Sequence, residues 1–325
     1  MKFWPFIKLL PDKTNLKFVK YAPIMGGLSV IAVIASVFLT LWPLTPPCGG
    51  LNCGVDFSGG LVVEVTAAPE AADIPGIRDG LNAMDLRDVQ VQAFGSPSDA
   101  LIRFQTPEGD PGEVLRAVQA TLTEVQPSIQ VTRTEAVSGQ VSQELLTNGV
   151  MALGVAMLMM LAYIWFRFQW TFGVGALIGL LHDVVLTFGL FAVTGMEFTL
   201  VSVAAVLTII GYSMNDTVVV CDRLRENLRK YKKMPLGEVI DLSLNETLSR
   251  TIMTGLTTIL GLLAIALLGG AVLASFAWAM IFGVIIGTYS SIFIAAPLIL
   301  LWGAKRGDEV DEEATPIKLG MASKP

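Results

Sequence analysis

The sequence predicts an α-helical membrane protein in which six transmembrane helices carry one α+β domain between the first and second helix. Hydrophobic residues make up 53% of the chain and charged residues 15%, whereas soluble domains normally contain about a quarter charged residues. Six apolar stretches are long enough to cross a membrane, which takes about 20 helical residues. The residues between the first two stretches, roughly a hundred, have the composition of a soluble domain.

The first apolar stretch is expected to stay in the protein as a membrane anchor, because it has full length and lacks the small-residue cleavage site of a signal peptide. The six predicted spans are 22–42, 147–166, 173–194, 199–222, 251–269 and 275–302. They divide the chain into an N-terminal segment (1–21), the first helix, a domain with its linkers (43–146), a five-helix region (147–302) and a tail (303–325).

The basic residues predict the orientation. Sixteen of the 22 lysines and arginines fall on one side if every span crosses. They are Lys2, Lys8, Lys13, Lys17, Lys20, Arg167, Arg223, Arg225, Arg229, Lys230, Lys232, Lys233, Lys305, Arg306, Lys318 and Lys324. The positive-inside rule makes that side the cytoplasm, so both termini are predicted to be cytoplasmic and the domain to be external.

The two sides suggest different partners. The external domain carries 14 acidic residues between Asp56 and Glu144 against five arginines, which makes nucleic acid an unsuitable partner. The N-terminal segment combines lysines with Phe3, Trp4, Phe6 and Phe18. Aromatic rings favour headgroup depth and lysines favour anionic lipid, so this segment is expected to contact the membrane surface.

A turn-rich linker, residues 45–60, joins the first span to the external domain. Its glycines allow the backbone to bend sharply. Cys48 and Cys53 both lie in this linker, and a small-loop disulfide is compatible with an oxidising compartment. Two unpaired thiols remain an alternative, because the spacing alone does not decide between them.

The external domain is predicted to have the ferredoxin-like order βαββαβ. The expected elements are strand 61–66, helix 74–84, strands 89–94 and 101–105 joined by a turn at 95–98, a helix starting at Pro111, and strand 129–137. The domain has no histidine, no nucleophile beside an obvious base and no metal-ligand cluster. We therefore expect a binding or mechanical module and no enzyme site.

Asp216 is the most informative membrane residue. It lies about four residues inside the last clear boundary of the fourth span. A carboxyl group at that depth costs about 2.5–3.5 kcal/mol on insertion scales, so it normally has a partner or a task. One interpretation is a structural hydrogen bond between helices, and the other is a site that responds to protons or ions.

Two further polar sites lie in the membrane. In the third span, Gly175, Gly179 and Asp183 recur every four residues, so the glycines permit close packing and Asp183 is expected to face the bundle. His182, the only histidine, lies next to Asp183, and we expect it to have a supporting role. Arg250 opens the fifth span at a depth similar to that of Asp216. The two form either a charge pair that a proton can loosen or a static ion pair.

Four segments together carry a resemblance to a known family. They are 54–60 (GVDFSGG), 181–184 (LHDV), 211–227 (GYSMNDTVVVCDRLREN) and 244–251 (LNETLSRT). The chain resembles the SecF family, the smaller membrane subunits of the bacterial SecDF protein-export complex, which is related to the resistance–nodulation–division transporters. The resemblance covers essentially the whole chain, with one departure at Cys53, where relatives have another residue.

The resemblance implies a function and partners. The chain would join SecD in a twelve-helix unit of the bacterial inner membrane, with its external domain in the periplasm. This unit would assist the SecYEG channel with SecA, and YajC as a further partner, by using the proton-motive force to move domains that hold an unfolded polypeptide. No catalytic chemistry and no cofactor is implied beyond the coupling ion, a proton with Na⁺ as the alternative.

The resemblance also implies site residues. The essential aspartate and its arginine partner fall on Asp216 and Arg250. The supporting polar positions are Tyr212, Ser213, Asn215, Thr254, Asp183 and His182, and the linker motif supplies Gly54, Asp56, Phe57, Gly59 and Gly60.

Two other interpretations remain at this point. A half-transporter of the same superfamily would export a lipid or small molecule, although such proteins usually have much larger external domains and twelve helices in one chain. A purely structural subunit would use its membrane charges only to hold helices in register.

Overall fold

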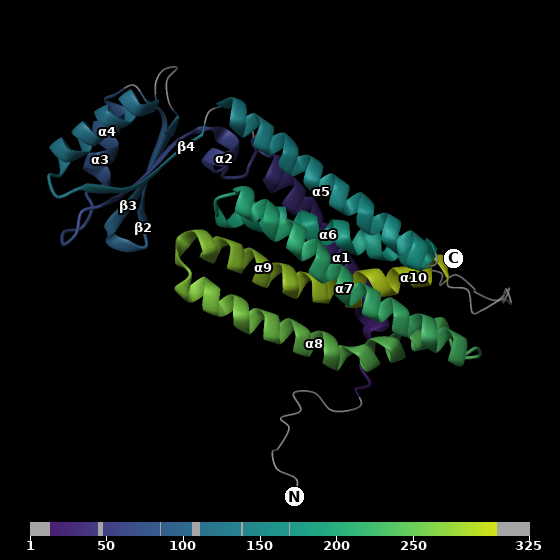
Figure 1. Ribbon diagram of the computed structural model, residues 1–325. Helices are drawn as coiled ribbons and strands as arrows, with labels where there is room; N and C mark the ends of the chain where they lie inside the picture. Colours follow the sequence, from purple (N-terminus) through teal and green to yellow (C-terminus); the bar gives the residue numbers. More distant parts are fainter. Residues whose placement is uncertain are drawn as a thin grey trace, which may run out of the picture.

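The computed structural model describes residues 14–44, 48–84, 86–105, 111–137, 139–168 and 170–303. Within them, a long helical bundle carries a small α/β domain at one end (Figure 1). The predictions for the lysines and aromatic residues before residue 14 and for the tail after residue 303 lie outside the described residues. The interfacial prediction for Phe18 is wrong, because this side chain is buried in the bundle and packs edge-on against Phe293.

The predicted fold class is confirmed, because six helices in the described part of the chain are long and apolar enough to cross a membrane. They are α1 (Phe18–Leu41), α5 (Gly139–Arg167), α6 (Trp170–Thr194), α7 (Leu200–Lys230), α8 (Leu236–Leu268) and a last span made of α9 (Gly270–Ser290), a π-helical turn η1 (Ser291–Ala295) and α10 (Ala296–Trp302). The inner helices α6, α7 and α9 are the most buried, whereas α1, α5 and α8 expose apolar side chains outward.

Three helices continue well beyond the apolar stretches that predicted them, and the first of these, α5, begins at Gly139 instead of 147. The polar end of α7 runs to Lys230, and α8 already begins at Leu236. These polar turns pack against each other through buried Leu224, Leu228 and Ile240. Asn227 on α7 also donates hydrogen bonds to Ser243 and Glu246 on α8. The criterion of an apolar run finds only the part of a helix that crosses the hydrocarbon, so it misses these ends.

The last span is interrupted where the sequence predicts one continuous helix. At η1 the backbone changes to π geometry, and the N–H of Ala296 donates to Ser291 O. Pro297 follows directly and has no N–H with which to continue the α-helical pattern. A single π turn inside an α-helix often marks a functional region.

The external domain has the predicted order βαββαβ. Its elements are β1 (Gly60–Thr66), α3 (Ile74–Asn82), β2 (Arg87–Phe94), β3 (Ser96–Gln105), α4 (Pro111–Val125) and β4 (Gln130–Val137). The strands form an antiparallel sheet in the order β2-β3-β1-β4, and both helices cover one face of it (Figure 1). Strand β3 begins at Ser96, directly after Gly95, because Gly95 alone makes the turn with a φ of 76°.

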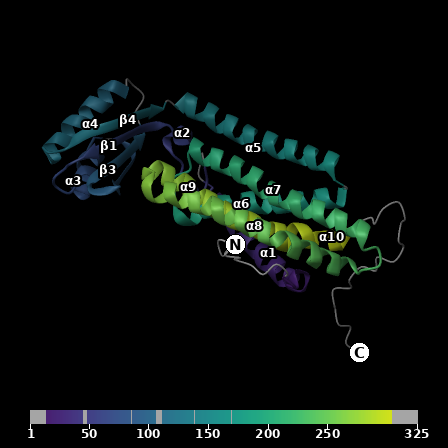
Figure 2. The same cartoon turned by 60° about the horizontal axis from the view of Figure 1, so that its bottom comes forward.

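The linker contains an element that the sequence did not predict. A short helix, α2 (Val55–Ser58), lies between the first span and β1. Gly59 and Gly60 follow it with φ angles of 71° and 116°, so the sharp bend expected from the glycines occurs here. Figure 2 shows α2 at the end of the bundle, between the sheet and the helices.

Candidate functional site

Asp183 is fully buried where α6, α7 and α9 meet. One carboxylate oxygen accepts hydrogen bonds from Ser213 on α7 and from Ser290 on α9, the latter at 2.7 Å. The glycine spacing of α6 explains the close approach, since a Cβ at Gly175 would lie 2.6 Å from Ala295 O in the π turn. The structure thus places Asp183 on the inner side that the small-residue pattern indicates.

His182 extends this polar cluster toward α1. Its Nδ1 lies 2.9 Å from the other carboxylate oxygen of Asp183, and its ring stacks on Tyr289 with 6.0 Å between ring centroids. The Tyr289 hydroxyl donates to Met25 O at 2.8 Å and lies 2.8 Å from Ser29 Oγ. His182 and Tyr289 therefore connect the buried carboxylate on α6 with the first helix.

Asp216 is buried on α7, one turn after Ser213. Its contact with a side chain of another helix is Thr288 on α9, whose hydroxyl donates to Asp216 Oδ2 at 3.4 Å. Arg250 on α8 acts on Asp216 only through its charge. Among the described residues no direct ion pair joins the two, because the Arg250 side chain is exposed on α8.

Among the described residues, no hydrogen bond joins the other predicted supporting residues to Asp216. Ser213 is bonded to Asp183 instead, and Asn215 is exposed on the outer side of α7. Thr254 donates to the backbone oxygen of Thr251 on its own helix. The Tyr212 hydroxyl is buried and has no hydrogen-bond partner among the described residues.

The sequence interpretation missed the hydroxyl-bearing residues of α9. Thr288 donates to Asp216 and Ser290 donates to Asp183, so neighbouring positions on one helix contact both buried carboxylates. A signal for them was present. Residues 288–291 (TYSS) are four consecutive hydroxyl side chains inside an otherwise apolar span.

The linker motif is packed against the turn between α6 and α7. The Gly54 N–H donates to Phe198 O at 2.9 Å, and the Phe57 ring stacks on Phe198 at 5.6 Å. Asp56 accepts a hydrogen bond from the Leu200 N–H at 2.9 Å. The packing around Gly54 is close, since a Cβ there would lie 2.7 Å from both Glu197 Oε1 and Thr199 Cγ2 and would displace these side chains. The segment is thus a defined contact between the domain and the start of α7.

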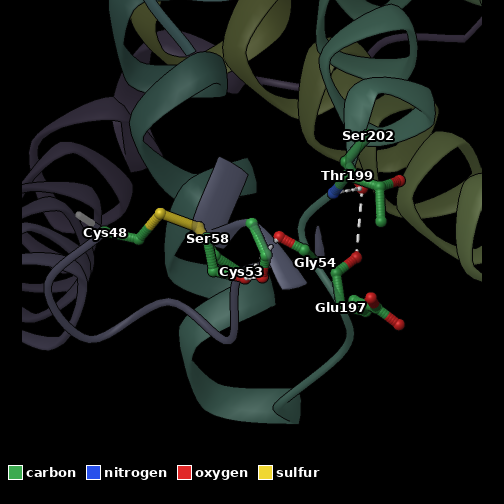
Figure 3. Close-up of a disulfide and its surroundings, with 8 residues drawn as sticks. Cys48, Cys53, Gly54, Ser58, Glu197, Thr199 and Ser202 are labelled. Carbon is green, nitrogen blue, oxygen red and sulfur yellow. Dashed lines mark hydrogen bonds between the residues drawn. A yellow bond between two sulfur atoms is a disulfide. The ribbon is translucent and has the colours of Figure 1, made fainter. Parts of the chain in front are cut away.

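Figure 3 shows the disulfide beside this contact. Cys48 and Cys53 are bonded, so the structure has the disulfide form of the two alternatives. On the other side of Gly54, Thr199 and Ser202 form a capping box at the start of α7, and Ser202 Oγ also donates to Glu197 O at 3.2 Å.

An ion pair joins the sheet to the same turn. Arg103 on β3 contacts Glu197 at 2.5 Å, and the exposed fractions of the two side chains are 9% and 27%. Burial raises the pKa of Glu197, an effect that the Arg103 charge and hydrogen bond oppose. No pattern in the sequence indicated this pair, because each residue lies in a segment of ordinary composition.

The described residues contain no group of three or more His, Cys, Asp and Glu side chains that could hold a metal ion. What the arrangement offers instead is two buried carboxylates in contact with hydroxyl groups. Such groups can exchange protons or bind a small cation.

Comparisons with known proteins agree on one family. The family model described as "Protein export membrane protein SecD/SecF, C-terminal" matches residues 117–305. The protein translocase subunit SecF of Rhodobacter capsulatus is 44% identical over 318 residues, which cover 93% of this chain and 93% of the relative. The subunit SecF of Rickettsia akari is 40% identical over 309 residues, which cover 94% and 97%.

Solved structures show the same similarity. The crystal structure of SecDF from Thermus thermophilus, described as a translocon-associated membrane protein, matches with a TM-score of 0.79 and 31% identity over 90% of this chain. SecDF in a super-membrane-facing form matches with a TM-score of 0.64 and 33% identity over 92% of this chain. This chain spans 39% and 40% of those two chains, respectively.

Proposed function

The chain belongs to the SecF family of protein translocase subunits, and on this basis we propose that it is an auxiliary subunit of the Sec translocase that uses the proton-motive force to promote late steps of protein export. It is a multi-pass membrane protein. We place it in the bacterial inner membrane, with both termini cytoplasmic and the α/β domain periplasmic, because of the lysine and arginine distribution.

The proposed partner is SecD. This chain spans 39% of the SecDF chain that it matches. The rest of that chain lies outside the match, and we propose that a separate SecD subunit supplies the corresponding part here. The apolar side chains that α1, α5 and α8 expose, such as Ile31, Leu158 and Leu267, suit both lipid and neighbouring helices. We also propose SecYEG with SecA, and YajC, as partners, and the only ground for these partners is membership of the family.

One observation carries the proposed coupling mechanism. Asp216 is buried on α7, and the first residue of the same helix, Leu200, is held by Asp56 of the domain linker. Protonation of Asp216 would remove its attraction for Arg250 and change how α7 packs against α8 and α9. A shift of α7 would then pull on the domain through its own N-terminal end.

These contacts favour a different route for the motion than the sequence suggests. The linker with its glycines at residues 54–60 joins the domain to the end of α1, so the order of the chain alone offers α1 as the element that moves the domain. In the structure, Phe198, Glu197 and Leu200 at the start of α7 contact the linker and β3 directly. We therefore propose α7 as the main connection, with α1 responding through Tyr289.

The proposed coupling ion is the proton. Thr288 donates its hydrogen to Asp216, and this geometry suits a carboxylate that gains and loses a proton. Na⁺ remains the alternative, and replacing the proton gradient with a Na⁺ gradient distinguishes the two. We propose no catalytic chemistry and no other cofactor, and the acidic domain is proposed to hold unfolded polypeptide weakly. The relatives are named protein translocase subunits, so we do not retain the half-transporter of lipids or small molecules.

The test uses the chain assembled with SecD in sealed inverted vesicles. Export of a secretory protein is measured with the gradient intact and after its collapse by an ionophore, and the ratio is the gradient response. Asp216→Asn should assemble with SecD and lose that response. Asp222→Asn is the matched control, because Asp222 is an exposed carboxylate on the same helix. A full gradient response in Asp216→Asn would make Asp216 a structural residue.

A further inference from the structure

The Tyr212 hydroxyl is an unsatisfied polar group inside the bundle. It is buried and has no hydrogen-bond partner among the described residues. A buried hydroxyl without a partner costs about 1–3 kcal/mol. In native proteins such groups are normally paired with protein atoms or with ordered water. The surroundings of Tyr212 Oη therefore show what can satisfy it.

Gly255 on α8 lies directly against this hydroxyl. A Cβ at residue 255 would lie 3.7 Å from Tyr212 Oη, 3.9 Å from Thr288 Oγ1 and 3.6 Å from Val284 Cγ1. Because residue 255 is glycine, the volume that a methyl group would occupy is bordered by two hydroxyl groups from two other helices. Thr288 already donates its hydrogen to Asp216 at 3.4 Å, so its oxygen is free to accept.

We propose that Gly255, Tyr212 and Thr288 form the seat of a bound water molecule that connects Tyr212 to Asp216 through the Thr288 hydroxyl. This inference rests on the proposed function, because it assigns the last step of proton delivery to that site. A buried water needs two to four polar partners, and the two hydroxyls supply them. No side chain larger than glycine at residue 255 leaves the same room.

The relay conserves atoms and charge. An excess proton arriving as hydronium passes to the Thr288 oxygen while Thr288 passes its own proton to the Asp216 carboxylate. Hydronium becomes water, the threonine hydroxyl is restored and Asp216 becomes neutral. Thr288 is hydrogen-bonded to Asp216 on α7, and the charge of Arg250 on α8 also acts on Asp216. One turn before Asp216 on α7, Ser213 bonds to Asp183 of α6.

A first experiment tests the water seat without reference to export. The thermal midpoint of the purified complex with SecD is compared for Tyr212→Phe, Gly255→Ala and the double variant. If a water satisfies Tyr212, Tyr212→Phe alone should lower the midpoint by about 2–4 °C. In the Gly255→Ala background, where a methyl group takes the place of the water, the same change should be neutral or stabilising.

The matched control is Gly261→Ala. Gly261 lies on the same helix with no atom near its Cβ position, so this variant measures the gain in helix propensity alone. The contacts of the Gly255→Ala methyl are of ordinary van der Waals length, so the variant is expected to fold. If Tyr212→Phe leaves or raises the midpoint in the wild-type background, the hydroxyl is merely unpaired and the water seat is wrong.

A second experiment tests the relay through the gradient response. Gly255→Ala should reduce the response at least about tenfold relative to Gly261→Ala, since a positioned proton relay contributes at least that much. Equal responses in the two variants would overturn the relay. Asp216→Asn, measured in parallel, separates this failure from failure of the proposed function. If Asp216→Asn loses the response while Gly255→Ala keeps it, the coupling role stands and only the relay is wrong.

Discussion

Asp56 accepts a hydrogen bond from the backbone N–H of Leu200, the first residue of the helix that carries Asp216. The N-terminal end of a helix has backbone donors without intrahelical partners and a partial positive charge. The carboxylate of the linker satisfies one of these donors from outside the bundle. This contact joins the linker of the α/β domain to the proposed coupling helix, beside the contacts of Phe198 and Glu197.

Replacement of Asp56 should weaken this connection. Asp56→Ala removes the acceptor and the negative charge, and comparable changes at helix N-termini cost about 0.5–2 kcal/mol. Asp56→Asn keeps an acceptor oxygen and should cost less. The measurement is thermal unfolding of the purified complex with SecD, with Ser58→Ala as the control on α2. Indistinguishable midpoints for Asp56→Ala and wild type would mean that the contact does not stabilise the complex.

Glu197 should make stability depend on pH in a defined direction. Burial raises its pKa in the folded state, so between the ordinary value of 4.5 and that raised value only the folded protein binds the proton. Stability therefore falls as pH rises through this window. Glu197→Gln cannot ionise and should lack this fall, so its midpoint should rise relative to wild type as pH increases. If the thermal midpoints of wild type and Glu197→Gln change with pH in parallel from pH 4 to pH 7, the raised pKa of Glu197 is wrong.

The two residues of α6 should respond unequally to substitution. Asp183→Asn leaves Ser213, Ser290 and His182 with a poorer acceptor and should cost about 1–3 kcal/mol of stability together with part of the gradient response. His182→Ala should act through the lost contact with Tyr289. Leu181→Ala is the adjacent exposed control. Full export and full stability in both Asp183→Asn and His182→Ala would show that α6 is only a scaffold.

Arg250 should be replaceable by another cation. It acts on Asp216 through its charge without a direct pair, so the planar geometry of a guanidinium is not required. Arg250→Lys should keep most of the gradient response, and Arg250→Met should lose it by leaving the buried carboxylate without its compensating charge. The same vesicle assay measures both. Equal losses of the gradient response in Arg250→Lys and Arg250→Met would instead indicate a contact that only arginine can make.

The external domain should contact an emerging polypeptide without sequence specificity. A photoreactive residue at exposed Thr134 on β4 samples the sheet, and one at exposed Thr123 on α4 samples the helical face. We expect crosslinks to an arrested secretory chain from the domain and none from exposed Arg229 at the other end of α7. Absence of crosslinks from both domain positions, in a complex that still exports, would remove this role.

Local patterns were sufficient for the architecture and for part of the site. Apolar length predicted the six spans, and the four-residue spacing of Gly175, Gly179 and Asp183 predicted which side of α6 faces inward. Contacts between distant segments were not predictable in this way. Ser290 bonds to Asp183 across 107 residues, and Arg103 meets Glu197 from another domain. Arg250 shows the converse, because similar depth in two neighbouring helices did not bring its side chain to Asp216.

The π turn at Ser291–Ala295 gives the last span one residue more than a regular α-helix needs over the same length. An α-helix turns about 100° per residue. Deletion of one residue in this turn would let the helix close regularly, because a π turn with one residue removed turns through almost the same angle as an ordinary α-helical turn. The π turn thus absorbs the extra residue locally and keeps the hydroxyl run of α9 in line with α10.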